Sequence, residues 1–209
     1  MHDEFYSRNL PHWHPAGAVL FLTWRLYGSL PLAKRTARNG CATNAHRHAA
    51  GKEFVLLDRR LDHCKLGPRW ATNPRVADSF IQLLYKGAER LSYFELLAYV
   101  VMPNHVHLVI APKKPLRQIT NGLKGATSRA ANAILNRTGK PFWQDESYDH
   151  WIRNEREFGR ICAYVECNPV SAGLVSKPED WRWSSANHRS TQSYTPPASR
   201  PQARVLESG

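Results

Sequence analysis

The feature that most constrains the fold is a largely apolar run, residues 93–111, which is broken at one place by Pro103 and Asn104. The pieces on either side have the length and the β-branched and aromatic content of buried strands. A proline–asparagine break between two such pieces is typical of a tight turn. The run therefore predicts two adjacent antiparallel strands, over residues 93–102 and 105–111.

Two histidines, His105 and His107, open the second of these strands. A strand alternates its faces with period two, so both imidazoles point to one face while Val106 and Leu108 point to the other. A buried pair of imidazoles is costly unless something binds it. The pair therefore predicts half of a metal site.

A second pair, His12 and His14, flanks Trp13 near the N-terminus. Pro11 and Pro15 bracket this pair, so we expect no strand here. A structural role or a contact with phosphate is the better interpretation of these histidines.

The rest of the chain alternates strand and helix patterns. Apolar periodicity predicts strands over 18–26 and 148–153, and helices over 74–91, over 116–134 and from 154. Asn154 is a predicted helix cap, with Glu157 completing a capping box. We expect this third helix to stop by Asn168, because Pro169 disfavours helical geometry in the residue before it.

The order of elements predicts the fold class. Strands and helices interleave, and two strands meet through a tight turn, which favours an α+β fold of the split β-α-β type, with an antiparallel sheet and helices packed on one face. We expect a single domain over 1–187 that contains a basic insertion at 32–75, with a short helical piece around 53–61. Composition predicts a mobile tail from Ser184 on, and the segment 188–209 lies outside the domain.

The net charge of the chain indicates which class of partner the protein binds. Lys and Arg number 29 against 17 acidic residues, a net charge of +12. Such a surface attracts polyanions, with nucleic acid as the first choice and an anionic membrane as the second. No apolar stretch approaches the length of a bilayer span, and the N-terminus lacks the pattern of a signal peptide. We therefore expect a cytoplasmic protein.

Tyr164 and Asn168 lie four residues apart on the predicted third helix, so their side chains stand one above the other. If this helix covers the sheet face that carries His105 and His107, four polar groups converge. Two imidazoles and an amide oxygen can hold a divalent metal, and they suit Mn at least as well as Mg. The Tyr164 phenol could then attack a phosphate whose charge that metal offsets.

Local sequences resemble a known family. Residues 97–108 (LAYVVMPNHVHL) resemble the histidine–hydrophobe–histidine segment of the HUH single-tyrosine transposases. Residues 164–175 (YVECNPVSAGLV) resemble the tyrosine helix of one branch, the REP-associated tyrosine transposases. Segments 10–13, 142–145 and 178–185 fit the same branch.

This resemblance implies a ferredoxin-like fold and metal-dependent cleavage and rejoining of single-stranded DNA at palindromic hairpin repeats, through a 5′-phosphotyrosine. It implies that Tyr164 attacks and that His105, His107 and Asn168 bind the metal, Mg or Mn. It also implies a nucleoid-associated enzyme that is a monomer rather than a dimer.

Several basic and aromatic residues are candidates for contacts with the DNA: Arg117, Lys124, Arg129, Arg153, His12 and Trp13. For the residues on the helix at 116–134, an ordinary solvated face is the simpler interpretation. Two other functions stay open. One is a non-catalytic DNA-binding protein derived from a transposase, and the other is a metal-dependent phosphoesterase that uses water as its nucleophile.

Overall fold

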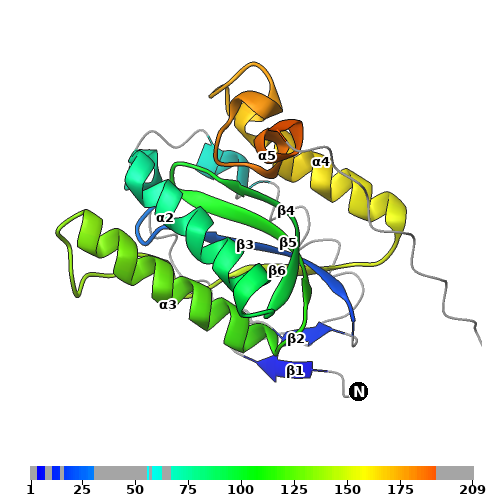
Figure 1. Cartoon of the computed structure of the whole chain (residues 1–209). Helices are drawn as coiled ribbons and strands as arrows, with labels where there is room; N and C mark the ends of the chain where they lie inside the picture. The colour runs from blue at the N-terminus through cyan, green and yellow to red at the C-terminus, as the bar shows by residue number, and fades with distance from the viewer. Residues whose placement is uncertain are drawn as a thin grey trace, which may run out of the picture.

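The computed structural model describes residues 4–7, 11–14, 17–30, 56, 58–62 and 67–191 of the 209-residue chain. Its main sheet is antiparallel throughout and has the strand order β4-β5-β3-β6 (Figure 1). The four strands are β3 (Val19–Arg25), β4 (Phe94–Val101), β5 (His105–Pro112) and β6 (Tyr148–Ile152). The predicted hairpin at Pro103 and Asn104 is confirmed, and β3 lies in the interior of the sheet.

Helices connect and cover these strands (Figure 1). They are η1 (Trp70–Thr72), α2 (Pro74–Tyr85), η2 (Lys86–Arg90), α3 (Leu116–Ile134), α4 (Glu155–Ser171), η3 (Pro178–Asp180) and α5 (Ser185–Thr191). The order β3, α2, β4, β5, α3, β6 is the split β-α-β arrangement, so the predicted α+β, ferredoxin-like class is confirmed. No helix among the described residues is long and apolar enough to cross a membrane.

The sheet has an apolar core on each face. Val106 and Leu108 of β5 pack in the core beneath α2 and α3, whereas Val109 packs with Phe21 of β3 in the core beneath α4. The prediction that the helices lie on one face is therefore wrong. It holds for α2 and α3, which lie on the same face. The interior strands are apolar on both faces and therefore need a cover on the other face as well, which α4 provides (Figure 1).

Both ends of α4 can be traced to the sequence. Asn154 caps the start, because its side chain accepts a hydrogen bond from the backbone N–H of Glu157 at 2.9 Å, as predicted. The prediction that the helix stops by Asn168 is wrong, since α4 includes Pro169 and ends at Ser171.

Gly173 sets the end of α4. It has φ of +69°, and its N–H donates to the carbonyl of Val170, while the N–H of Leu174 donates to the carbonyl of Pro169, each at 2.9 Å. This pair of bonds is the Schellman motif, which satisfies the last carbonyls of a helix. The motif carries the helix one turn beyond Asn168 and so keeps Asn168 inside α4.

The structure near the two ends of the chain contradicts two further predictions. Strands β1 (Glu4–Ser7) and β2 (Pro11–His14) form a separate ribbon, so the prediction of no strand at His12 is wrong. Pro11 stands at the first position of β2, where a proline is tolerated. The prediction of a mobile tail from Ser184 on is also wrong for residues 184–191. Ser184 pairs with Val100 of the edge strand β4, and helix α5 follows. Residues beyond 191 lie outside the described part.

We expect Gly173→Ala to lower the free energy of unfolding by about 1 kcal/mol, because an L side chain is strained at this positive φ. Urea denaturation measures the change. Gly159→Ala is the matched control: Gly159 lies within α4, nothing lies within 4 Å of an added Cβ, and alanine should stabilise by about 0.5–1 kcal/mol there. Equal effects of the two substitutions would contradict the assigned helix end.

Candidate active site

The two histidines of β5 point to the face that α4 covers. Their ring centroids lie 4.7 Å apart, and His105 and His107 are 1% and 0% exposed. Imidazoles can be buried this deeply only when their ring nitrogens have partners. The partners therefore indicate what the pair does.

Neighbouring side chains hold the Nδ1 atom of each ring. Thr23 stands opposite His107 in the β3–β5 register, and its Oγ1 lies 2.7 Å from His107 Nδ1. The Oδ1 of Asn104 lies 2.7 Å from His105 Nδ1. A carbonyl oxygen only accepts, so Nδ1 of His105 carries the proton and its Nε2 keeps a free lone pair. This orientation is typical of metal-ligating histidines.

Burial sets the charge of His105. Burial first, and then the charge of His107, lower the pKa of His105 to about 3, although the carboxylate of Asp58 opposes this change. The ring is therefore neutral at neutral pH, and the neutral ring is the form that binds a metal.

Asp58 completes a cluster with the two histidines. Its Oδ1 lies 3.2 Å from Nε2 of His107 and 3.7 Å from Nε2 of His105. Burial raises the pKa of Asp58, but the interaction with His107 and the hydrogen bond from Asn168 outweigh burial and leave the pKa below its ordinary value, so the carboxyl group is ionised at neutral pH. One ligand atom from each of the three residues lies within 4.8 Å of the others.

Sequence reasoning missed Asp58. The residue belongs to a short helical segment, 58–62, within the basic insertion. Asp62 follows it by four residues, so both carboxylates lie on one helix face, and Asp62 Oδ1 is 3.7 Å from His105 Nε2. That spacing is the signal that could have found the segment. The same part of the chain overlaps the helical piece predicted around 53–61.

Asn104 docks this segment against the histidines. Its Nδ2 donates to the backbone carbonyl of Leu61 at 2.9 Å, while its Oδ1 faces His105. Leu61 is buried, with 2% of its surface exposed. One turn residue between β4 and β5 therefore positions both a histidine ring and the segment that carries Asp58.

The α4 residues lie over the same cluster. Asn168 is 1% exposed, and its Nδ2 donates to Oδ2 of Asp58 at 3.4 Å. The half-buried Tyr164 ring lies 5.7 Å from the His107 ring and 6.1 Å, edge to face, from the Phe21 ring. The predicted convergence of two imidazoles, an amide and a tyrosine ring is thus what the structure contains.

The donor set fits a divalent metal. Nε2 of His105 and Oδ1 of Asn168 are buried, and neither forms a hydrogen bond within the described residues. Buried polar atoms are normally satisfied, so such atoms beside a carboxylate indicate a bound ion. Imidazole nitrogens with carboxylate and amide oxygens suit a first-row divalent cation.

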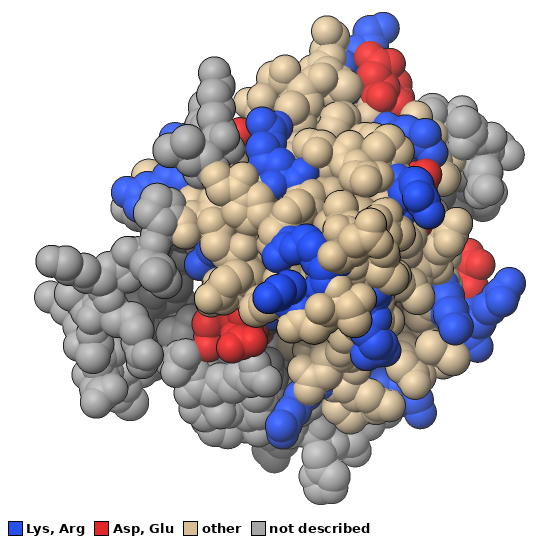
Figure 2. Space-filling model, turned by 90° about the vertical axis from the view of Figure 1, so that its left-hand side faces the viewer, with Lys and Arg blue, Asp and Glu red and all other residues tan. Residues whose placement is uncertain are grey.

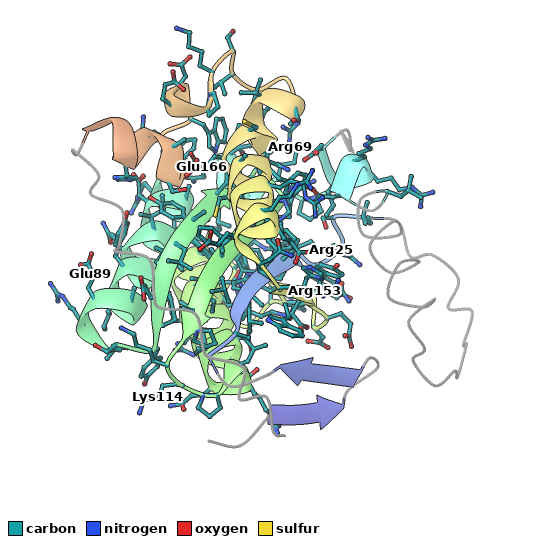
Figure 3. All side chains as sticks on the ribbon, turned by 90° about the vertical axis from the view of Figure 1, so that its right-hand side faces the viewer. Arg25, Arg69, Glu89, Lys114, Arg153 and Glu166 are labelled. Carbon is teal, nitrogen blue, oxygen red and sulfur yellow. The ribbon has the colours of Figure 1, made fainter. Side chains whose placement is uncertain are left out.

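The predicted DNA contacts divide between the two faces of the sheet. Arg117, Lys124 and Arg129 lie on α3, across the sheet from the cluster, and Lys124 Nζ donates to the carbonyls of Gln144 and Asp145 at 2.7 and 2.8 Å. Figure 2 shows the side at which α3 ends, where Lys and Arg side chains stand over a largely uncharged surface. Arg153 lies near the start of α4 (Figure 3). The side chains of His12 and Trp13 lie outside the described part.

Residues 69–168 match the family model described as "Transposase IS200 like". This range contains the two histidines, the tyrosine and the asparagine, but it begins after Asp58. The resemblance predicted from the motifs is therefore confirmed.

A REP-associated tyrosine transposase of Escherichia coli (strain K12) is 28% identical over 92 residues, which cover 44% of this chain and 53% of that relative. The chain thus spans about half the length of this relative. A solved structure of a REP-associated tyrosine transposase bound to a REP hairpin has a TM-score of 0.54 at 16% identity, over 97% of this chain and 98% of that one. This similarity shows a shared fold.

We expect Mn²⁺ to raise the thermal stability of the protein. Asp58→Asn should weaken Mn²⁺ affinity at least tenfold, because loss of a residue that only supports a metal ligand already weakens affinity about tenfold or more. At a concentration of one hundred times Kd, Mn²⁺ should stabilise the unmutated protein by about 2.7 kcal/mol. Titration calorimetry and thermal unfolding, with EDTA as the reversal, measure both effects.

Glu89→Gln removes the same charge from an exposed position on the other side of the molecule (Figure 3) and should leave Mn²⁺ affinity unchanged. Equal affinity of Asp58→Asn and Glu89→Gln would exclude Asp58 as a ligand.

Proposed function

We propose that this chain is a metal-dependent transposase or endonuclease of single-stranded DNA, which cleaves and rejoins its substrate through a covalent bond to Tyr164. The observation that carries the proposal is the Tyr164 ring, 5.7 Å from His107, beside a cluster suited to a divalent metal. The confirmed resemblance to IS200-like transposases supports the same chemistry.

The residues have distinct roles in this proposal. His105, His107, Asp58 and Asn168 hold the metal, which supplies charge to offset the negative charge that develops on the phosphate. Either Mn or Mg satisfies this requirement, and the two imidazoles favour Mn. Thr23 and Asn104 hold the two rings with their Nε2 atoms toward the cluster.

Tyr164 makes the covalent bond. Its phenol oxygen loses its proton and bonds to phosphorus, the bond from phosphorus to the 3′ oxygen breaks, and the 3′ oxygen takes up a proton and leaves as a hydroxyl. The DNA end is held as a 5′-phosphotyrosine. A 3′ hydroxyl can later attack that phosphorus and release the tyrosine, so rejoining is the reverse of cleavage.

Tyr148 is the other tyrosine near this face, and it is the poorer nucleophile. Burial, followed by the charges of Asp149 and Glu157, raises the pKa of Tyr148 to about 12, which keeps the phenol protonated. Its ring packs against Phe21, with the ring centroids 6.2 Å apart.

The proposed substrate is a single-stranded hairpin formed by a palindromic, REP-like repeat. The net charge of +12 favours such a polyanion, and the solved structure of similar fold holds a REP hairpin. Of the predicted DNA contacts whose side chains the structure describes, Arg153 is the one that lies on the α4 side, whereas Arg117, Lys124 and Arg129 lie on α3. We further propose that the protein acts on the nucleoid in the cytoplasm, as a monomer.

We expect the purified protein, incubated with labelled hairpin DNA and Mn²⁺ and then denatured, to carry the label covalently. Tyr164→Phe and His105→Ala should abolish the labelled band, because they remove the nucleophile and a metal ligand. Tyr148→Phe is the matched control and should retain the band.

Cleavage by Tyr164→Phe without any adduct would replace the proposal with a phosphoesterase that uses water. Salt-sensitive binding by every variant, with neither adduct nor cleavage under any metal, would replace it with a non-catalytic DNA-binding protein.

A further inference from the structure

A cation stands beside the candidate metal cluster. Arg25 is the last residue of β3, and its register partner on β5 is His105. Directly opposed residues of an antiparallel pair share a face and are nearest neighbours. Arg25 therefore belongs to the face of the cluster, two residues along β3 from Thr23, which is paired with His107.

Within the described residues, no acidic side chain balances the charge of Arg25. The side chain is half-buried, and burial alone lowers its pKa. Its hydrogen bond runs from Nη1 to Oγ of Ser29 at 3.4 Å, and no acid among the described residues forms an ion pair with it. A partly desolvated guanidinium that uses one of its five donors within the described residues can bind an oxyanion.

The charges of the cluster indicate what that oxyanion is. Asp58 and Asp62 bring at most two negative charges, which a bound divalent cation would balance. The charge of Arg25 is then left for an anionic ligand beside the metal. A phosphodiester carries one negative charge and two non-bridging oxygens, which match the fork of a guanidinium.

We propose that Arg25 binds the phosphate that Tyr164 attacks, and that Arg69 and Arg153 bind neighbouring phosphates of the same strand. This inference rests on the proposed function. Figure 3 shows all three arginines on one side of α4, the side toward segment 58–62, whereas Glu89 and Lys114 lie on the other side. Arg25 precedes the range 69–168 that matches the family model.

The first test is equilibrium binding, which needs no turnover. In a Tyr164→Phe background with Mn²⁺ present, Arg25→Gln should weaken binding of a labelled single-stranded hairpin about tenfold or more. The slope of log Kobs against log salt should fall by about 0.7, as for the loss of one phosphate contact with a single strand. Arg25→Lys should be intermediate, since it keeps the charge but not the fork.

The second readout separates this role from a structural one. Arg25→Gln should bind Mn²⁺ as tightly as the unmutated protein or more tightly, because a neighbouring positive charge is removed. Arg90→Gln, at the exposed end of η2, makes the same change in net charge and should leave hairpin binding within twofold.

Equal binding by Arg25→Gln and Arg90→Gln would overturn the inference, as would loss of Mn²⁺ affinity together with DNA affinity in Arg25→Gln. The absence of a covalent adduct in the unmutated protein would instead overturn the proposed function, and the binding assay would still report on Arg25.

Discussion

The register between β3 and β5 is the constraint on which the rest of this site depends. It sets Thr23 against His107 and Arg25 against His105, and it turns both imidazoles toward α4. A slip by one residue would move every side chain of β5 to the other face. The histidines would then point into the core beneath α2 and α3, where no carboxylate or amide of the cluster could reach them. Pairing on both sides of β3 and β5 makes such a slip costly, because it would disturb the ladder hydrogen bonds to two neighbouring strands and bury the two imidazoles without partners.

Much of this arrangement could be predicted because the signals are local. The hairpin follows from Pro103 and Asn104, the common face of the histidines follows from the period of a strand, and the start of α4 follows from Asn154. The end of α4 could not be predicted from Pro169 alone. The glycine at 173 and the leucine after it form a motif that outweighs the local preference of a proline.

What sequence reasoning missed is non-local. Asp58 meets the histidines from an insertion with little apolar periodicity, and no spacing rule connects it to β5 or to Asn168, 110 residues further along the chain. The second covered face of the sheet is non-local as well, because it depends on where the chain goes after β6. Both are consequences of packing, since apolar or polar groups on an open sheet face need partners that the strands do not supply.

The two hydrogen bonds of Asn104 connect the position of segment 58–62 with the orientation of the His105 ring. The side chains of Asp58, His105, His107 and Asn168 are at most 1% exposed, so under the proposed function the segment 58–62 would have to shift before a phosphate could reach them. Such a shift would take away the carbonyl of Leu61, which fixes which end of the Asn104 amide faces His105. An amide rotated by half a turn would present a donor to Nδ1, and the imidazole proton would have to move to Nε2. Nε2 would then no longer offer a lone pair to a metal, so the orientation of one amide would decide whether His105 could serve as a ligand.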